Sequence, residues 1–268
     1  MPELPEVETV RRGLLPLIGL RISRLILNRN DLRFPFPADF DSIEGRRIIA
    51  IERRAKYLLI RLEGDLTWLV HLGMTGRFGH EEEKHSHVIV SFEDGERLVY
   101  TDPRRFGIMD LIRTGENHKL LSEIGPEPLS AEWSAANLHD SLSGRRISIK
   151  SALLNGRIVA GIGNIYASEI LFRTGVSPRR LACNLSKAKA ERLHAATRSI
   201  LSAAIEAGGS TLSDGQFRNV EGDLGYFPHE FAVYDRAGLI CESEDCDAGI
   251  ERIIQQGRST FFCPRCQR

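Results

Sequence analysis

The sequence predicts an α+β protein of several domains: an N-terminal β domain, a helical domain and a small C-terminal tail held together by a metal. Three observations indicate this organisation. Short β-type runs with tight turns fill the first part, helical periodicity follows a glycine- and proline-rich break at residues 125–128, and four cysteines crowd into the last 28 residues. The chain of 268 residues is long enough for two or three domains with a sizeable core.

The first eight residues, Met-Pro-Glu-Leu-Pro-Glu-Val-Glu, predict an unusual reactive group. Proline at position 2 favours removal of Met1, which would leave the secondary amine of Pro2 beside the carboxylate of Glu3. An α-amine titrates at about 7.7–8.0, so part of it is neutral and nucleophilic near pH 7. Such an amine condenses with a sugar aldehyde carbon to an iminium, and Glu3 can protonate the sugar oxygen. The alternative is a plain helix start with proline and acids in its first turn.

The region that follows changes from one helix to many strands. Val7, Val10 and Leu14 recur at helical spacing, and Pro16 ends that helix nearby. From Arg21 to about Arg113, short β-type runs separated by turn signals predict a sandwich or a barrel. The clearest runs are Ile22–Leu27, Arg47–Ile51, Tyr57–Leu62, Thr67–Leu72, Val88–Phe92 and Arg97–Thr101.

Past Gly125-Pro126-Glu127-Pro128 the periodicity becomes helical. The expected helices are Ala135–Leu142, Ile147–Leu154, Ile165–Arg173 and Lys187–Ala207, the last closed by Gly208-Gly209. Residues 213–230 are expected to form a loop, and the tail from Phe231 returns to strand-like runs. We therefore expect a catalytic β domain with an N-terminal helix at 1–130, a helical domain at 131–230 and a metal-bound tail at 231–268.

Charge and hydropathy restrict the possible partners. The formal net charge is zero, which argues against nonspecific binding of nucleic acid by the chain as a whole. A neutral chain can still carry a basic face, and the paired arginines at 46–47, 53–54, 104–105 and 145–146 would contribute to one. No run of eighteen apolar residues exists, and no basic segment precedes an apolar one at the N-terminus. We therefore expect a protein of the cytoplasm that does not contact a membrane.

Four cysteines predict a metal site. Cys241, Cys246, Cys263 and Cys266 follow the pattern C-x4-C and C-x2-C. Four thiolates at these spacings close a tetrahedral structural zinc site and leave no open position for catalysis. A redox-active cysteine pair is the alternative, and the spacing favours a single zinc ion. Arg258 lies on the expected strand before the second pair, where its guanidinium could reach a phosphate.

The turn Gly161-Ile162-Gly163-Asn164 lies between two helical runs. A glycine-rich turn that opens a helix presents free N–H groups and the positive end of the helix dipole to an anion. We expect Asn164 to act both as the helix N-cap and as a phosphate contact. A simple corner between two helices is the alternative.

Two stretches that contain glycines, His71–Gly76 and Asp102–Gly107, follow expected strands. Met74 and Phe106 would then stand in exposed loops as apolar wedges, with Arg104 beside them as a polar group. This combination suits entry into a duplex in place of an extruded nucleotide. The alternative is that the methionine and the phenylalanine belong to the core.

Taken together, six spaced stretches resemble the formamidopyrimidine-DNA glycosylase family over the whole chain. They are Pro2–Thr9, Arg54–Leu58, His71–Gly76, Asp102–Gly107, Gly161–Glu169 and Arg258–Gln267. Leu4 and the Asp-Pro-Arg-Arg-Phe-Gly run are more similar to this purine-directed branch than to the pyrimidine-directed endonuclease VIII branch.

The resemblance implies a β-sandwich, a helix–two-turn–helix domain and a zinc finger. It implies base-excision repair of 8-oxoguanine and formamidopyrimidines in double-stranded DNA by a monomer, followed by β,δ-elimination at the abasic site. Pro2 would be the Schiff-base nucleophile, Glu3 the acid that opens the sugar, Lys56 the lysine of β-elimination and Arg258 the arginine of δ-elimination. The implied DNA-contacting residues are Met74, His85, Arg104, Phe106, Arg146, Lys150 and Asn164.

The chain departs from the family pattern at several places. Four residues separate the first two cysteines where two are usual, Asp235 replaces a usual glycine, Asn155-Gly156 replaces Asp-Gln, and Pro228 stands where glutamine is common. These changes leave the expected chemistry intact and leave the preferred base open. Oxidised pyrimidines are the alternative substrates, and a noncatalytic zinc-ribbon DNA-binding protein is the alternative from another class.

Overall fold

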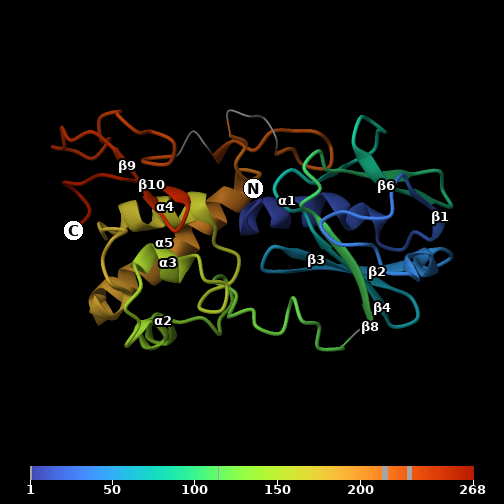
Figure 1. Ribbon diagram of the computed structural model, residues 1–268, viewed down its shortest axis with the longest axis horizontal. Coiled ribbons are helices and arrows are strands. Elements are labelled where there is room, and N and C mark those ends of the chain that lie inside the picture. The colour runs from blue at the N-terminus through green and yellow to red at the C-terminus, as the bar shows by residue number, and fades with distance from the viewer. Residues whose placement is uncertain (1, 114, 213–216, 228–230) are drawn as a thin grey trace. The chain divides into compact units, whose positions relative to one another are not determined.

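The computed structural model describes residues 2–113, 115–212, 217–227 and 231–268, and the chain divides into two compact units (Figure 1). The first unit comprises Met1–Ser122 and Ile205–Pro228, and the second comprises Glu123–Ala204 and His229–Arg268. Pro228 itself lies outside the described residues. The three expected domains stay a prediction. The two compact units divide the chain differently: the cysteine-rich tail belongs with the helices, and residues 205–228 belong to the first unit.

The first unit is a sandwich of two four-stranded antiparallel sheets, which confirms the predicted β-sandwich and excludes a barrel. The sheet orders are β1-β6-β7-β5 and β2-β3-β4-β8. The strands are β1 Ile22–Leu27, β2 Ile48–Arg54, β3 Tyr57–Leu62, β4 Leu66–His71, β5 Arg77–Gly79, β6 Ser86–Phe92, β7 Arg97–Thr101 and β8 Ile108–Arg113.

One apolar core joins both sheets and the N-terminal helix. Trp68 from one sheet and Tyr100 from the other are fully buried in it. Helix α1, Leu4–Leu14, adds Val7 and Val10, which recur at helical spacing as expected. Burying each large apolar side chain stabilises the fold by about 1.5–3 kcal/mol. Two single-turn 3-10 helices complete the unit: η1 Leu15–Leu17 and η2 Phe40–Ile43.

The second unit consists of helices and one β-hairpin. Its elements are α2 Ala135–Leu142, α3 Ile149–Leu153, α4 Asn164–Arg173, η3 Ala182–Asn184, α5 Lys187–Glu206, β9 Glu251–Gln255 and β10 Arg258–Phe262. The last two residues of α5 belong to the first unit. All four predicted helices are therefore present. Helix α3 is shorter than expected at its N-terminus because the Ser148 side chain accepts from the Ser151 backbone N–H and fixes the start there.

The hairpin of β9 and β10 is anchored on the helices. Strand β10 packs against α4 (Figure 1). The buried Glu169 of α4 accepts three backbone N–H bonds, from Ala232, Val233 and Tyr234, at 2.7–3.1 Å. These bonds fix the segment that leads into the cysteine-rich tail. Among the residues that the structure describes, no helix is long and apolar enough to cross a membrane.

Candidate active site and nucleic-acid interface

The N-terminal turn holds Pro2 and Glu3 directly before helix α1. Both residues are buried, and Glu3 is only 1% exposed. Glu3 is the N-cap of a capping box: its backbone N–H donates to Glu6 Oε2 at 2.8 Å, and its side chain accepts from the Glu6 backbone N–H. The other carboxylate oxygen of Glu6 accepts from the Ser210 N–H at 2.8 Å. The turn is thus a helix start, as the alternative interpretation expected, and also a fixed support for the Pro2 nitrogen.

Lys56 lies in the two-residue turn between β2 and β3. Ala55, the first residue of that turn, has φ +53°, the left-handed region that a type I′ or II′ hairpin turn requires at this position. Arg53 holds the turn from one side, because its Nη1 donates to the Ala55 carbonyl at 2.9 Å and its Nε donates to Glu8 of α1 at 3.2 Å. A chain of hydrogen bonds therefore joins the helix that begins at Glu3 to the turn that carries Lys56.

Glu8 is the anion in this chain. Burial raises the pKa of its carboxyl group, but hydrogen bonds and positive charge from Arg11 and Arg53 outweigh that effect and lower the pKa below its ordinary value. Arg11 binds both oxygens of Glu8, at 2.8 and 3.0 Å. The carboxylate therefore stays charged and keeps both arginines in place.

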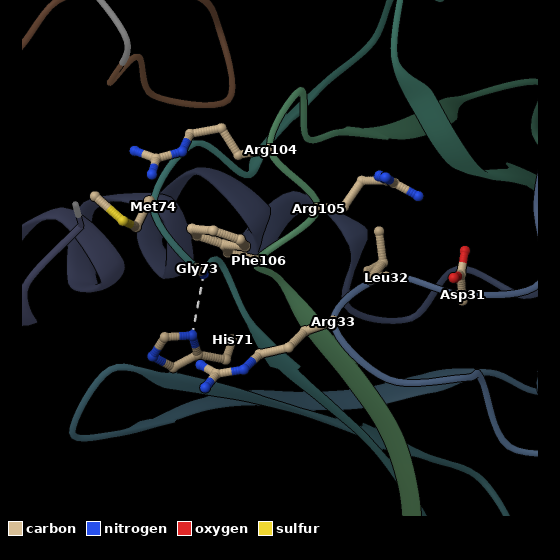
Figure 2. A pocket seen from close by; sticks show the side chains of 9 residues that line it. All are labelled: Asp31, Leu32, Arg33, His71, Gly73, Met74, Arg104, Arg105 and Phe106. Carbon is tan, nitrogen blue, oxygen red and sulfur yellow. Dashed lines mark hydrogen bonds between the residues drawn. The ribbon is translucent and has the colours of Figure 1, made fainter.

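Met74, Arg104 and Phe106 line one pocket of about 640 Å³ in the first unit (Figure 2). The Phe106 side chain is 42% exposed, and the Arg104 guanidinium carbon lies 4.8 Å from the centre of its ring, a cation–π arrangement. Met74 is half-buried at the wall of the same pocket. The alternative that Phe106 belongs to the core is wrong, and the three predicted wedge residues lie together.

His71 and Arg33 also line this pocket, and the residue patterns did not identify either as functional. The Nδ1 of His71 accepts the Gly73 backbone N–H at 3.0 Å, so the neutral ring carries its proton on Nε2 (Figure 2). Burial, and then the charges of Lys56 and Arg33, lower the pKa of His71 to about 4. The ring is thus an uncharged N–H donor beside a cation. The position of His71 at the start of the His71–Gly76 stretch could have identified it as a candidate site residue. No sequence pattern marked Arg33.

His85, another expected DNA contact, is exposed on the turn before β6, with φ +72°. Its backbone carbonyl accepts the Asp102 N–H at 3.1 Å. The exposed ring is therefore carried by a fixed backbone.

The expected contacts in the second unit divide into exposed and buried groups. Arg146 and Arg258 are exposed. Lys150 is only 1% exposed, and its Nζ donates to the Ser259 carbonyl at 3.0 Å and to Thr260 Oγ1 at 2.7 Å. The ammonium group therefore holds strand β10 beside Arg258, and its direct contact with DNA stays a prediction.

Asn164 is not the N-cap of α4, contrary to expectation. Gly163 takes that position, and Asn164 is the first helical residue. Its Nδ2 donates to the Ser259 carbonyl at 2.9 Å, the same oxygen that Lys150 binds. Gly161, two residues earlier, turns the chain with φ +79°, which glycine adopts readily, and Gly163 itself is extended.

The four clustered cysteines lie with their sulfur atoms within 4.8 Å of one another. The Cys241–Cys266 and Cys246–Cys263 sulfur separations are 3.9 and 3.6 Å. A disulfide needs about 2.05 Å. Sulfurs bound to zinc at about 2.3 Å in a tetrahedron lie about 3.8 Å apart. The donor set therefore fits one structural zinc ion with no open coordination position.

Comparison with known families agrees with these features. The profile described as the formamidopyrimidine-DNA glycosylase N-terminal domain matches residues 1–109, and that of the formamidopyrimidine-DNA glycosylase H2TH domain matches residues 124–216. A zinc finger found in FPG and IleRS matches residues 244–268. The chain belongs to the formamidopyrimidine-DNA glycosylase family.

Individual family members cover the chain from end to end. The formamidopyrimidine-DNA glycosylase of Cereibacter sphaeroides is 49% identical, with 100% of both chains aligned. The crystal structure of MutM (Fpg) from Thermus thermophilus superposes with a TM-score of 0.92 at 42% identity, covering 99% of this chain and 98% of that one. The Lactococcus lactis Fpg, solved with DNA containing an abasic site, gives 0.89 at 33% identity and 99% coverage of both.

The zinc finger keeps its geometry despite the departure from the usual glycosylase spacing. The family match begins at residue 244, after Cys241, yet this cysteine joins the cluster. Asp245 adopts φ +58° and the Cys246 N–H donates to the Ser243 carbonyl at 3.1 Å, so the two extra residues form a tight turn. The longer loop is therefore compatible with one cluster of all four sulfur atoms.

Proposed function

We propose that this protein excises oxidised purines from double-stranded DNA and cleaves the strand at the resulting abasic site by β,δ-elimination. The observation that carries the proposal is a full-length match to formamidopyrimidine-DNA glycosylases in a chain that keeps the Pro2-Glu3 turn. The Lactococcus lactis Fpg was solved with DNA containing an abasic site, and a mutant of it with DNA containing Fapy-dG, which supports the same substrate class here.

The first chemical step uses the N-terminal turn. After removal of Met1, the Pro2 nitrogen bonds to C1′ of the damaged nucleotide while the bond from C1′ to the base breaks and the departing base takes up a proton. Glu3 gives a proton to the ring oxygen as the sugar opens, and loss of the proton on Pro2 completes the iminium. Pro2 and Glu3 are buried in a fixed turn, which favours this sequence of steps because neither the nitrogen nor the carboxyl group needs to be reoriented.

Strand cleavage follows from the iminium. It draws electrons from C2′, so loss of a proton there expels the 3′-phosphate, and a second elimination expels the 5′-phosphate. Lys56 and Arg258 would bind the phosphates that leave, because charge-assisted hydrogen bonds favour the anionic leaving group. Water then releases the sugar remnant from Pro2. The four clustered cysteines would hold a structural zinc ion that stabilises the hairpin of Arg258, and the steps above use only groups of the protein and water.

The remaining predicted residues bind and open the duplex. Met74, Arg104 and Phe106 would fill the space of the extruded nucleotide, which offsets part of the few kcal/mol that extrusion costs. The sugar-phosphate backbone would be contacted by His85, Arg146 and Asn164. Lys150 would contact DNA beside them. Such backbone contacts position the duplex and carry no sequence information.

Borohydride trapping tests the chemistry. Enzyme mixed with an 8-oxoguanine duplex and borohydride should yield a covalent complex of summed mass, with the sugar on the peptide that begins at Pro2. Glu3→Gln should still trap on a preformed abasic site and excise the intact base poorly. An N-terminally extended protein, whose Pro2 nitrogen is an amide, should lose both activities. Full cleavage by the extended protein would refute the role of Pro2 and make Lys56 the leading nucleophile.

The substrate range is tested on matched duplexes. Excision of 8-oxoguanine should exceed excision of an oxidised pyrimidine; the reverse order would assign the enzyme to pyrimidine repair. No nicking of an abasic duplex would identify a noncatalytic DNA-binding protein.

We further infer that the protein acts as a monomer in the cytoplasm. One chain supplies every group in the proposed mechanism, and the relatives compared above come from bacteria, in which DNA lies in that compartment. Light scattering of the DNA complex should give one protein chain per duplex, and a mass of two chains would refute the monomer.

A further inference from the structure

Asp102 is fully buried, at 0% exposure, beneath the loops that carry the wedge residues. Burying a carboxyl group is costly unless hydrogen bonds satisfy it. Its Oδ1 accepts from the Thr75 hydroxyl at 2.5 Å, and its Oδ2 accepts from the Gly107 N–H at 2.8 Å. The Thr75 hydroxyl in turn accepts the Arg104 N–H at 3.3 Å. One carboxyl group therefore connects the loop of Met74 to the loop of Arg104 and Phe106.

The backbone of Asp102 fixes a third turn. Its N–H donates to the His85 carbonyl, and its carbonyl accepts from the Arg105 N–H at 3.1 Å and from His87 Nε2 at 2.9 Å. Burial lowers the pKa of His87, so the ring is a neutral donor to that carbonyl. The turn of His85 and the two wedge loops thus share one buried anchor.

Close packing leaves the two wedge loops little freedom to separate. A Cβ added at Gly73 would collide with the backbone of Phe106 and Gly107, so the loops touch along their main chains. Gly73 also has φ +68°, which other residues rarely adopt. Below the contact, the Tyr100 hydroxyl lies 3.5 Å from Asp102 Oδ2. Burial and the negative charge of Asp102 raise the pKa of Tyr100 well above its ordinary value, so it remains a donor.

We propose that Asp102, acting through Thr75, is a positioning residue that joins the Met74 loop to the loop of Arg104 and Phe106 as one rigid wedge. The inference rests on the proposed function, in which these three side chains replace an extruded nucleotide. A wedge made of two independent loops would lose conformational freedom on entering the duplex, whereas a preassembled one does not. The Arg104–Phe106 stacking is the arrangement that such an anchor maintains.

Thr75 offers a test that spares the buried carboxyl group. Thr75→Val removes the bridging hydroxyl at nearly constant volume, and Thr75→Ser keeps it. Three quantities are measured: excision of 8-oxoguanine paired with cytosine under single-turnover conditions, nicking of a preformed abasic duplex, and fluorescence of 2-aminopurine placed beside the lesion. Thr75→Val should lower excision about tenfold, the factor for a hydrogen bond of about 1.4 kcal/mol. It should leave nicking within about twofold and abolish the fluorescence rise that reports unstacking.

Thr75→Ser should restore all three quantities. Equal losses of excision and nicking in Thr75→Val, or an unchanged fluorescence rise, would limit Asp102 and Thr75 to stabilising the fold and overturn the proposal. Phe106→Ala, measured in the same assays, distinguishes failure of this positioning role from failure of the proposed function. If Phe106→Ala also reduces both activities equally, the wedge itself is wrong. If it lowers excision selectively and Thr75→Val does not, only the positioning role is wrong.

Discussion

The two units position their expected DNA-contacting residues in opposite ways. In the first unit Arg104 and Phe106 are exposed, and the charged group beneath them, Asp102, is buried. In the second unit the expected contact Lys150 is itself buried, and the exposed cation is Arg258. Lys150 binds the carbonyl of Ser259, the neighbour of Arg258. A basic residue that is expected to contact DNA can therefore instead support a neighbouring residue that is exposed.

Loss of zinc should produce the largest effect, and this effect should be confined to the second unit. Zinc binding contributes about 10–16 kcal/mol in isolated finger peptides, so Cys263→Ser should remove the metal and unfold the hairpin of Arg258. Metal analysis should give one zinc per chain in the wild type and DNA affinity should fall at least about tenfold in the variant. The β-sandwich should keep its own unfolding transition. A metal-free protein with full DNA affinity would contradict this prediction.

Lys150→Met tests the buried support directly. It removes the ammonium group and leaves Ser259 O and Thr260 Oγ1 without that donor, which should cost about 3 kcal/mol of unfolding free energy. Thermal and urea denaturation measure the loss. Arg146→Met is the matched control, because an exposed arginine should change stability by less than about 0.5 kcal/mol. A wild-type stability for Lys150→Met would show that the ammonium group does not hold β10.

His71 should make the first unit sensitive to acid. Its folded pKa is about 4 and its ordinary value 6.5, so above pH 6.5 both folded and unfolded rings are neutral and stability is complete. Between pH 6.5 and 4 the unfolded ring takes up a proton that the folded ring excludes, so stability falls by about 2–3 kcal/mol. The melting temperature should therefore drop more steeply over this range in the wild type than in His71→Gln. Parallel pH profiles would remove His71 from this role.

Arg146→Ala should have the smallest effect and no effect on folding. Each phosphate that a cation neutralises contributes about 0.9 to the slope of log affinity against log salt, so the slope should fall by about that amount. Affinity should decrease equally for damaged and undamaged duplexes. Lys150→Met, measured at a temperature where it is folded, should leave the slope unchanged. A lower slope for Lys150→Met would place its ammonium group on DNA and remove the contrast between the two units.

Most of the secondary structure could be predicted because its periodicity is local. The runs at residues 22–27 and 57–62 coincide with β1 and β3, and the run at 135–142 coincides with α2. Strand β5 has three residues, which is too short for any alternation to show. The return of residues 205–228 to the first unit depends on contacts with residues far away in the sequence, and no local pattern carries that information.

The exposure of a side chain could be predicted where it lies in a loop that contains glycine. Burial could not be predicted where it depends on a partner that is distant in the sequence. The exposed position of Phe106 could be expected because Gly107 follows it in a loop, and Met74 lies between Gly73 and Gly76 in the same way. The burial of Lys150 could not be found, since its partners Ser259 and Thr260 lie more than 100 residues away. The hydrogen bond between Asp102 and Thr75, which lies 27 residues earlier, could not be predicted for the same reason.

The bond between Glu6 and Ser210 spans 204 residues and sets an order of events during synthesis. A ribosome adds about 5–20 residues per second, so Ser210 is made about 10–40 s after Glu6. During that interval the N-terminal turn lacks the partner that later holds it. We expect removal of Met1, which the proposed chemistry requires, to occur in this interval, because Pro2 and Glu3 are buried in the completed fold. The N-terminal turn would then be processed before the unit that encloses it is complete.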